Sequence, residues 1–123
     1  MNALGKHILM ELNDCDKDIL NDTDALKGIL VTAASEAGAT VLGESFHRFN
    51  PHGISGVVII AESHLFIHTW PEYGYAAADI FTCGDTVKPQ KAAQLIIQKL
   101  GAGNHSIKEM DRGILNVKQG VSG

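Results

Sequence analysis

The residues of this chain that could do nucleophilic chemistry gather around the tripeptide Glu62-Ser63-His64. Apolar, β-branched runs flank it, Val57–Ala61 before and Leu65–Thr69 after, and this pattern predicts a hairpin. A Glu-Ser pair is not the Asn-Gly or glycine-rich pair that tight hairpins prefer. Because an unfavourable turn residue often marks a functional or strained site, the sequence directs attention to Ser63.

A hydroxyl, an imidazole and a thiol stand at the predicted ends of neighbouring strands. Ser55 precedes the first strand of the hairpin, His68 ends the second, and Cys83 ends a further strand over Tyr75–Phe81. We expect these groups to lie within reach of the turn. Ser, His and Cys at adjacent strand ends can support nucleophilic chemistry.

Three stretches of the sequence carry a family resemblance. The run ESHLFIHTWPEYGYAAADIFTCG closely resembles the core of bacterial and archaeal S-adenosylmethionine decarboxylases. The stretches FHRFNPHGISGVVI (46–59) and LGKHILMEL (4–12) are similar to the same family. The resemblance covers nearly the whole chain and is weakest after about Gly101. It implies a self-processing, pyruvoyl-dependent enzyme of polyamine synthesis.

The resemblance implies that the single domain, residues 1–123, cuts itself between Glu62 and Ser63. Attack of the Ser63 hydroxyl on the Glu62 carbonyl turns the peptide into an ester, a reaction that proximity favours. Elimination and hydrolysis then leave a β chain (1–62) and an α chain (63–123) that begins with a covalent pyruvoyl cofactor. In this reading His68 is the base of processing, and the Ser55 hydroxyl assists the ester intermediate.

The same resemblance implies the second reaction and its residues. S-adenosyl-L-methionine condenses with the pyruvoyl ketone, which acts as an electron sink when carbon dioxide leaves. Cys83 is then the acid that protonates the product, S-adenosyl 3-(methylthio)propylamine, which serves spermidine synthesis. The residues implied for substrate binding are Phe49 at the adenine or sulfonium, Glu72 at both ribose hydroxyls, and Leu65 and Trp70 as pocket lining.

Two other functions remain open. Some similar proteins decarboxylate arginine or ornithine, and neither Glu72 nor Phe49 separates these substrates, since a guanidinium also suits a carboxylate and an aromatic ring. The chain could also be an inactive homologue that regulates an active one. Intact Ser63, His68 and Cys83 argue against that role.

Composition excludes several other classes of function. His64 and His68 would lie about 13 Å apart on a strand, too far to share an ion, so we expect no metal. The net charge of −4, without a Lys/Arg cluster, argues against nucleic acid. No apolar run approaches the ~20 residues of a membrane span. With only Cys15 and Cys83, a reducing cytoplasm is the expected location.

Alternating and helical patterns predict the elements that must position these residues. Besides the hairpin and the strand 75–81, we expect strands over 5–13, 40–49 and 105–109, helices over 23–37 and 89–100, and a loose tail from Gly113. The predicted fold is α+β, a two-layer sandwich of an antiparallel sheet with two helices on one face, in the order β-α-β-β-β-α-β. The other face stays apolar, so we expect a homodimer with α-β-β-α layers.

Overall fold

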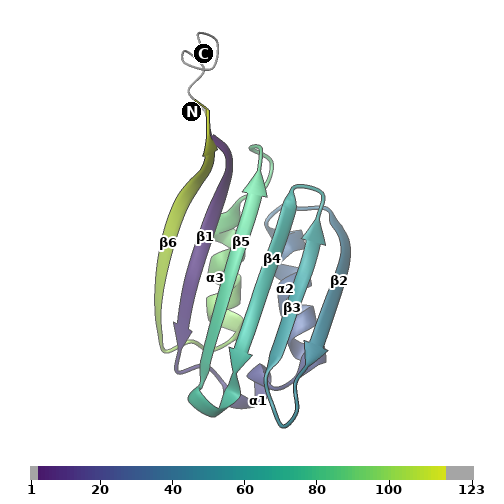
Figure 1. Ribbon diagram of the computed structural model, residues 1–123, viewed down its shortest axis with the longest axis vertical. Helices are drawn as coiled ribbons and strands as arrows, with labels where there is room; N and C mark the ends of the chain where they lie inside the picture. The colour runs from purple at the N-terminus through teal and green to yellow at the C-terminus, as the bar shows by residue number, and fades with distance from the viewer. Residues whose placement is uncertain (1–2, 116–123) are drawn as a thin grey trace.

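The computed structural model describes residues 3–115, and within this range six strands form one antiparallel sheet. Figure 1 shows the sheet face-on, in the strand order β2-β3-β4-β5-β1-β6. The strands are β1 (Ala3–Asn13), β2 (Val41–Arg48), β3 (Ile54–Ile60), β4 (Ser63–Trp70), β5 (Tyr75–Cys83) and β6 (Asn104–Ile114).

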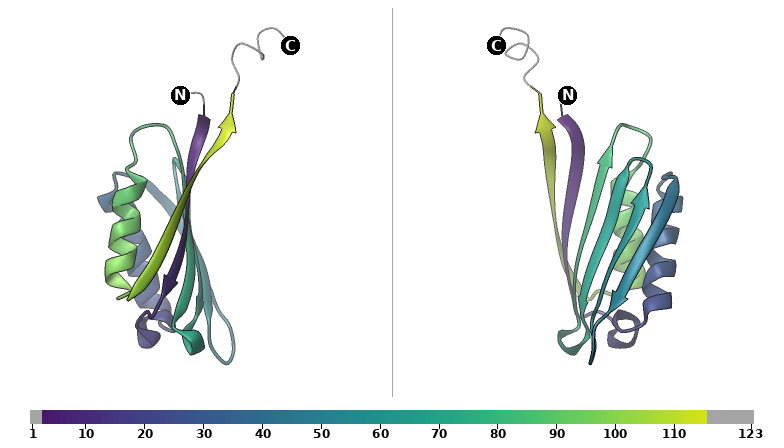
Figure 2. Two further views of the ribbon diagram at one scale, coloured as in Figure 1. Left: turned by 90° about the vertical axis from the view of Figure 1, so that its left-hand side faces the viewer. Right: turned by 45° about the vertical axis from the view of Figure 1, so that its right-hand side comes forward.

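Two helices, α2 (Thr23–Glu36) and α3 (Pro89–Lys99), cover one face of the sheet (Figure 2). A short helix α1 (Lys17–Leu20) and a 3-10 turn η1 (Pro71–Tyr73) lie together at one end of the sheet. The predicted α+β sandwich with helices on one face is therefore confirmed. No helix among residues 3–115 has the length and apolar character needed to cross a bilayer.

The core lies between the sheet and the two helices because each element contributes one apolar face. Alternate residues of β1, β4 and β5 point toward the helices, and these side chains are buried. Each helix contributes one stripe of buried apolar residues at helical spacing to the same core. The largest fully buried side chains include Ile8, Met10, Leu12, Leu26, Leu30, Leu65, Ile67, Ile80 and Ile96.

The ends of the helices follow short polar signals. Asp22 caps α2, because its carboxylate accepts a hydrogen bond from the backbone N–H of Ala25 at 3.0 Å. Gly38, at φ 90°, follows the end of α2, where a left-handed residue commonly ends a helix. Helix α1 was not expected, since four residues are too few to show a periodic pattern.

The predicted order of elements along the chain and the bounds of the last strand need correction. The order β-α-β-β-β-α-β has three strands between the two long helices, whereas the structure has four, because both strands of the hairpin, β3 and β4, lie between β2 and β5. Strand β6 is longer than 105–109, because β1 pairs with it from Asn13↔Asn104 to Ala3↔Ile114. Gly113 and Ile114 thus belong to β6, and the expected tail beyond residue 115 lies outside the described residues.

The face of the sheet away from the helices, which we call the free face, carries exposed apolar side chains. Leu9, Ile59, Trp70 and Met110 are between 40% and 48% exposed. Their neighbours on this face include polar residues of β1, β4 and β5 that are only partly buried. Several exposed apolar side chains gathered on one face are typical of an interaction surface.

Candidate active site

The peptide that precedes Ser63 forms the end of a tight hairpin. The turn residues are Ala61 and Glu62, and Ile60 pairs with Ser63 across it. Ser63 and His64 therefore belong to β4, so the predicted turn at Glu62-Ser63-His64 is one position out at its start and two at its end. The turn is tied to the start of β2, since Ala61 N–H donates to the Thr40 carbonyl at 2.9 Å.

Ser63 has an unusual backbone conformation. Its φ is 150°, in a region that residues with a Cβ rarely adopt. Such a conformation costs on the order of 1–3 kcal/mol and persists only where the surroundings impose it. Here the surroundings are the two-residue turn on one side and the pairing of Ser63 with Thr82 of β5 on the other. The peptide before Ser63 is therefore held in a strained position.

The carbonyl of Glu62 already has a hydrogen-bond donor. The backbone N–H of Cys83 donates to this oxygen at 2.9 Å. The same residue carries a free, exposed thiol at the end of β5. Glu62, Ser63 and Cys83 thus lie together at one end of the sheet, the upper end in Figure 1. We call this the hairpin end.

A second group of predicted residues lies at the opposite end of the same strands. Ser55 and His68 are directly paired between β3 and β4, and the Ser55 Oγ lies 2.9 Å from His68 Nδ1. The Phe66 ring stacks on the His68 ring with centroids 4.9 Å apart. A cavity of about 340 Å³ opens here, and its lining includes Phe49, His52, Ser55, His68, Trp70 and Glu72. We call this the cavity end.

The structure separates the two groups within one chain. His68 is five residues beyond Ser63 on an extended strand, and at roughly 3.3 Å per residue the two lie about 17 Å apart. The expectation that Ser55 and His68 lie within reach of the turn in the same chain is therefore wrong. The physical reason is the antiparallel hairpin, in which Ser55 and His68 stand at the open end and Ser63 at the closed end.

Leu65 belongs to neither group. Its side chain is 1% exposed and lies in the core beneath the helices. Leu65, Ile67 and Thr69 of β4 point to the helices, whereas His68 and Trp70 point to the free face or its rim. The Leu65 side chain is therefore unavailable to a ligand on the free face.

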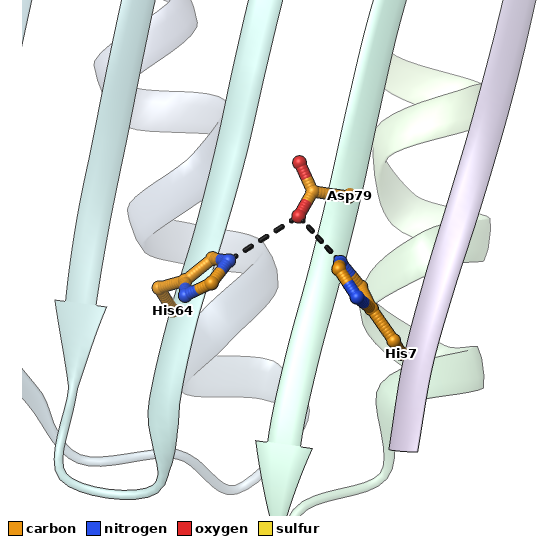
Figure 3. Close-up of side chains that lie close together, drawn as sticks. All are labelled: His7, His64 and Asp79. Carbon is orange, nitrogen blue, oxygen red and sulfur yellow. Dashed lines mark hydrogen bonds and ion pairs between the residues drawn. The ribbon is translucent and has the colours of Figure 1, made fainter. Parts of the chain in front are cut away.

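A further polar cluster lies on the free face between the two ends. Asp79 of β5 accepts from His7 Nε2 at 2.7 Å and from His64 Nε2 at 3.2 Å, as Figure 3 shows. Arg112 of β6 donates from Nη1 to His7 Nδ1 at 2.9 Å. The sequence signal for this cluster was a carboxylate, Asp79, in an otherwise apolar strand. His7 and His64 lie beside Asp79 only because β1 and β4 flank β5 in the sheet, which the sequence pattern does not show.

The nitrogen and oxygen atoms of His7, His64 and Asp79 lie within 4.8 Å of one another, a spacing that could hold a metal ion. The Arg112 guanidinium, however, only donates hydrogen bonds, so His7 Nδ1 must accept and the ring proton stands on Nε2. That proton already points at Asp79. A metal on His7 Nε2 would require this proton to leave and the Arg112 contact to break, so the geometry favours a hydrogen-bonded network.

Tyr75 and Glu11 form another pair beside the cavity end. The Tyr75 hydroxyl lies 2.8 Å from both Glu11 carboxylate oxygens, and its ring lies 5.3 Å from the Trp70 ring. Burial and the hydrogen bond to Glu11 raise the pKa of Tyr75 to about 12. The phenol therefore stays protonated and holds the Glu11 carboxylate in place on the free face.

Known proteins resemble this chain over most of its length. The sequence profile of the S-adenosylmethionine decarboxylase family matches residues 6–113. The S-adenosylmethionine decarboxylase proenzyme of Thermodesulfovibrio yellowstonii is 59% identical over 116 residues, which cover 94% of this chain and 86% of the relative. That of Carboxydothermus hydrogenoformans is 52% identical over 115 residues, which cover 94% of this chain and 91% of the relative.

A solved structure shares the fold. The crystal structure of the adenosylmethionine decarboxylase from Aquifex aeolicus superposes with a TM-score of 0.88 at 37% sequence identity. The match covers 95% of this chain and 97% of the other.

Proposed function

The chain belongs to the S-adenosylmethionine decarboxylase family, and from this we propose that it is a self-processing decarboxylase of S-adenosyl-L-methionine. The products are S-adenosyl 3-(methylthio)propylamine, an aminopropyl donor for spermidine, and carbon dioxide. The relatives' designation as proenzymes supports a chain that is activated by processing. The observation that carries the proposal in this chain is the strained Ser63 beside a Glu62 carbonyl that already accepts a hydrogen bond.

The first step is an acyl shift at the hairpin end. Ser63 Oγ attacks the Glu62 carbonyl carbon, and the oxygen that becomes negative is the one that accepts the Cys83 N–H. A donor placed in advance on a developing oxyanion is worth about 3–4 kcal/mol in other enzymes. The C–N bond then breaks, the nitrogen of residue 63 takes a proton, and an ester joins the two residues. Breaking this peptide also releases the φ strain at Ser63.

The second step requires a base at the Cα of residue 63. Removal of the Cα proton expels the Glu62 carboxylate and leaves a dehydroalanine, which one water converts into the pyruvoyl group with release of ammonia. His68 of the same chain cannot reach this proton across about 17 Å, since a base must approach within roughly 3 Å. The base, if it is His68, must come from a second copy.

A two-fold homodimer supplies that copy. If two free faces pack together with the strands reversed, the cavity end of one protomer covers the hairpin end of the other. Each site would then combine Glu62, Ser63 and Cys83 of one chain with Ser55 and His68 of its partner. The exposed apolar side chains of the free face support this arrangement, because pairing the sheets would remove them from water. The result is the predicted order of α-β-β-α layers.

The pyruvoyl group formed from Ser63 supplies a ketone for the substrate amine and an electron sink for the loss of carbon dioxide. The residues around Ser63 fit this group, because Ser63 is only partly buried and the exposed Cys83 lies next to it at the hairpin end. Cys83 donates its proton to the former Cα of the substrate. Since the mechanism needs a free thiol there, a reducing cytoplasm is the proposed location.

The cavity end supplies the substrate contacts. Phe49 and Trp70 offer aromatic surface for the adenine or the sulfonium, and the Glu72 carboxylate can accept from the ribose hydroxyls. The Leu65 side chain takes no part, since it is buried on the other face. In the proposed dimer this cavity stands over the partner's hairpin end, as the substrate requires.

Intact-mass spectrometry of the purified protein tests the proposal. We expect two fragments, residues 1–62 and 63–123, the second with a terminal ketone that reacts with hydrazines, and an uncut Ser63→Ala variant. Carbon dioxide release from S-adenosyl-L-methionine, arginine and ornithine, measured side by side, identifies the substrate. Unbroken protein that decarboxylates, or unbroken protein with no activity on any of the three, would overturn the proposal, and the latter would favour a regulatory homologue.

A further inference from the structure

His52 lines the cavity end and contacts the carboxylate that we assign to the ribose. His52 Nε2 lies 3.2 Å from Glu72 Oε1. A carboxylate only accepts hydrogen bonds, so Nε2 must carry a proton and donate it. Both side chains are about 38% exposed, and both face the same cavity.

The backbone holds both residues in place from separate anchors. His52 lies in a turn that Phe49 N–H closes by donating to the Gly53 carbonyl at 2.7 Å. The Gly53 N–H donates in turn to Asn21 Oδ1 at 3.3 Å, which ties this turn to the end of α1. Glu72 lies in η1, and the carbonyl of Gly74, the residue after η1, accepts a hydrogen bond from Cys15 N–H at 2.9 Å. Asn21 and Cys15 lie on either side of α1, so the contact joins two turns that are both tied to the segment around this helix.

The His52 contact restricts the orientation of the Glu72 carboxylate. A lone Glu on a short turn can rotate about three side-chain bonds, and fixing them when a ligand binds costs conformational entropy. With Oε1 held by His52, Oε2 and the second lone pair of Oε1 remain free on one side of the carboxylate. Two neighbouring hydroxyls, such as the 2′ and 3′ groups of a ribose, each donate one hydrogen bond and match this pair of acceptors.

We propose that His52 is a specificity-determining positioning residue, which holds Glu72 so that the pocket recognises the intact ribose diol. This inference rests on the proposed function, because it assumes a nucleoside substrate. It assigns His52 no contact with the reacting atoms. Its effect should therefore appear in the binding of the ribose and not in the chemical step.

The test compares adenosine with 2′-deoxyadenosine as ligands of the processed protein, by calorimetry and by competitive inhibition of carbon dioxide release. The ratio of their dissociation constants isolates one ribose hydroxyl. We expect Glu72→Gln to reduce the ratio, His52→Ala to reduce it about fivefold, as loss of one hydrogen bond to a carboxylate allows, and His52→Gln, which keeps an N–H donor, to retain most of it. The His105→Ala variant removes an exposed histidine on β6 and should keep the wild-type ratio.

The outcomes distinguish a failure of the proposed function from a failure of the proposed role of His52. If the wild-type protein releases no carbon dioxide from S-adenosyl-L-methionine, the proposed function fails. If it releases carbon dioxide but binds neither nucleoside, the pocket does not recognise the ribose and the role of His52 is wrong. If it binds both and His52→Ala keeps the wild-type ratio, the role of His52 is wrong even though the function stands. A His52→Ala variant that changes the rate of turnover at saturation but not the ratio also overturns it. Should His52→Ala fold poorly, His52→Asn and His52→Gln replace it in the same comparison.

Discussion

Co-expression of two variants that are each unprocessed tests whether one chain completes the site of the other. The Ser63→Ala chain lacks the attacking hydroxyl but keeps His68, and the His68→Ala chain has the reverse defect. In the proposed dimer, the intact His68 of the first chain stands over the intact Ser63 of the second. The mixed dimer therefore has one complete site and one site that lacks both groups.

The separation of about 17 Å between Ser63 and His68 decides the expected size of the effect. If two differently tagged chains assort at random, about half of the dimers are mixed, and each has one intact site of two. Processing and decarboxylation should therefore recover to about one quarter of the wild-type level in the mixture and about one half in purified mixed dimers. A denaturing gel with tag-specific detection should show that only the His68→Ala chain is cut.

The matched control pairs Ser63→Ala with Cys83→Ala. Both residues lie at the hairpin end of the same chain, where the Cys83 N–H donates to the carbonyl of Glu62, the residue before Ser63. Mixing these two variants assembles no site that has both groups, so decarboxylation should stay at the level of the separate variants. If the His68→Ala chain remains uncut in purified mixed dimers, or if both mixtures recover equally, the shared site is refuted.

Three further predictions concern the thiols and the core. Cys83→Ala should be cut normally but release carbon dioxide about 10²- to 10⁴-fold more slowly, as for loss of a general acid, and normal turnover would exclude that role. Thr69→Val should lower the free energy of unfolding by about 1–3 kcal/mol in urea titrations, because the buried hydroxyl donates to the Leu20 carbonyl at 2.8 Å and accepts from Ile54 N–H at 3.0 Å. Thr69→Ser should lose much less. Burial, with Asp14 adding, raises the pKa of the Cys15 thiol from 9.0 to about 11, so the unfolded chain loses this proton first. Wild-type stability should fall relative to Cys15→Ala as pH rises from about 9 to about 11, and parallel profiles would contradict this cause.

Local patterns predicted the layers of the fold because burial leaves a periodic trace. The stripe that includes Leu26, Leu30 and Ala33 marks α2, and alternation marks the two faces of β4. For β6 only the part over 105–109 was predicted, since nearly all of its residues are exposed and the periodic pattern is weak. It exists because β1 offers a full ladder of backbone groups, and such pairing depends on strand order. The same holds for the network of His7, His64 and Asp79, which needs β1 beside β5.

The family resemblance implied which residues belong to the candidate site, but it did not predict where the fold places them. The rise per residue that keeps His64 and His68 from sharing an ion also separates Ser63 from His68. A site read as one cluster along the sequence is therefore split between two ends of a sheet. Composition alone could not show this, because the only sign of a second copy in one chain is a set of exposed apolar side chains on the free face of the described residues.

The position of the proposed cut, next to a two-residue turn, has a consequence for refolding. The ladder between β3 and β4 runs from Ser55↔His68 to Ile60↔Ser63, and scission after Glu62 leaves all of it in place. Before scission each protomer unfolds to one polypeptide, and afterwards it unfolds to two that can diffuse apart. Refolding of the cut protomer then requires two separate chains to associate, and the rate of this step depends on their concentration. Dilution should therefore hinder renaturation of the mature enzyme far more than that of its precursor.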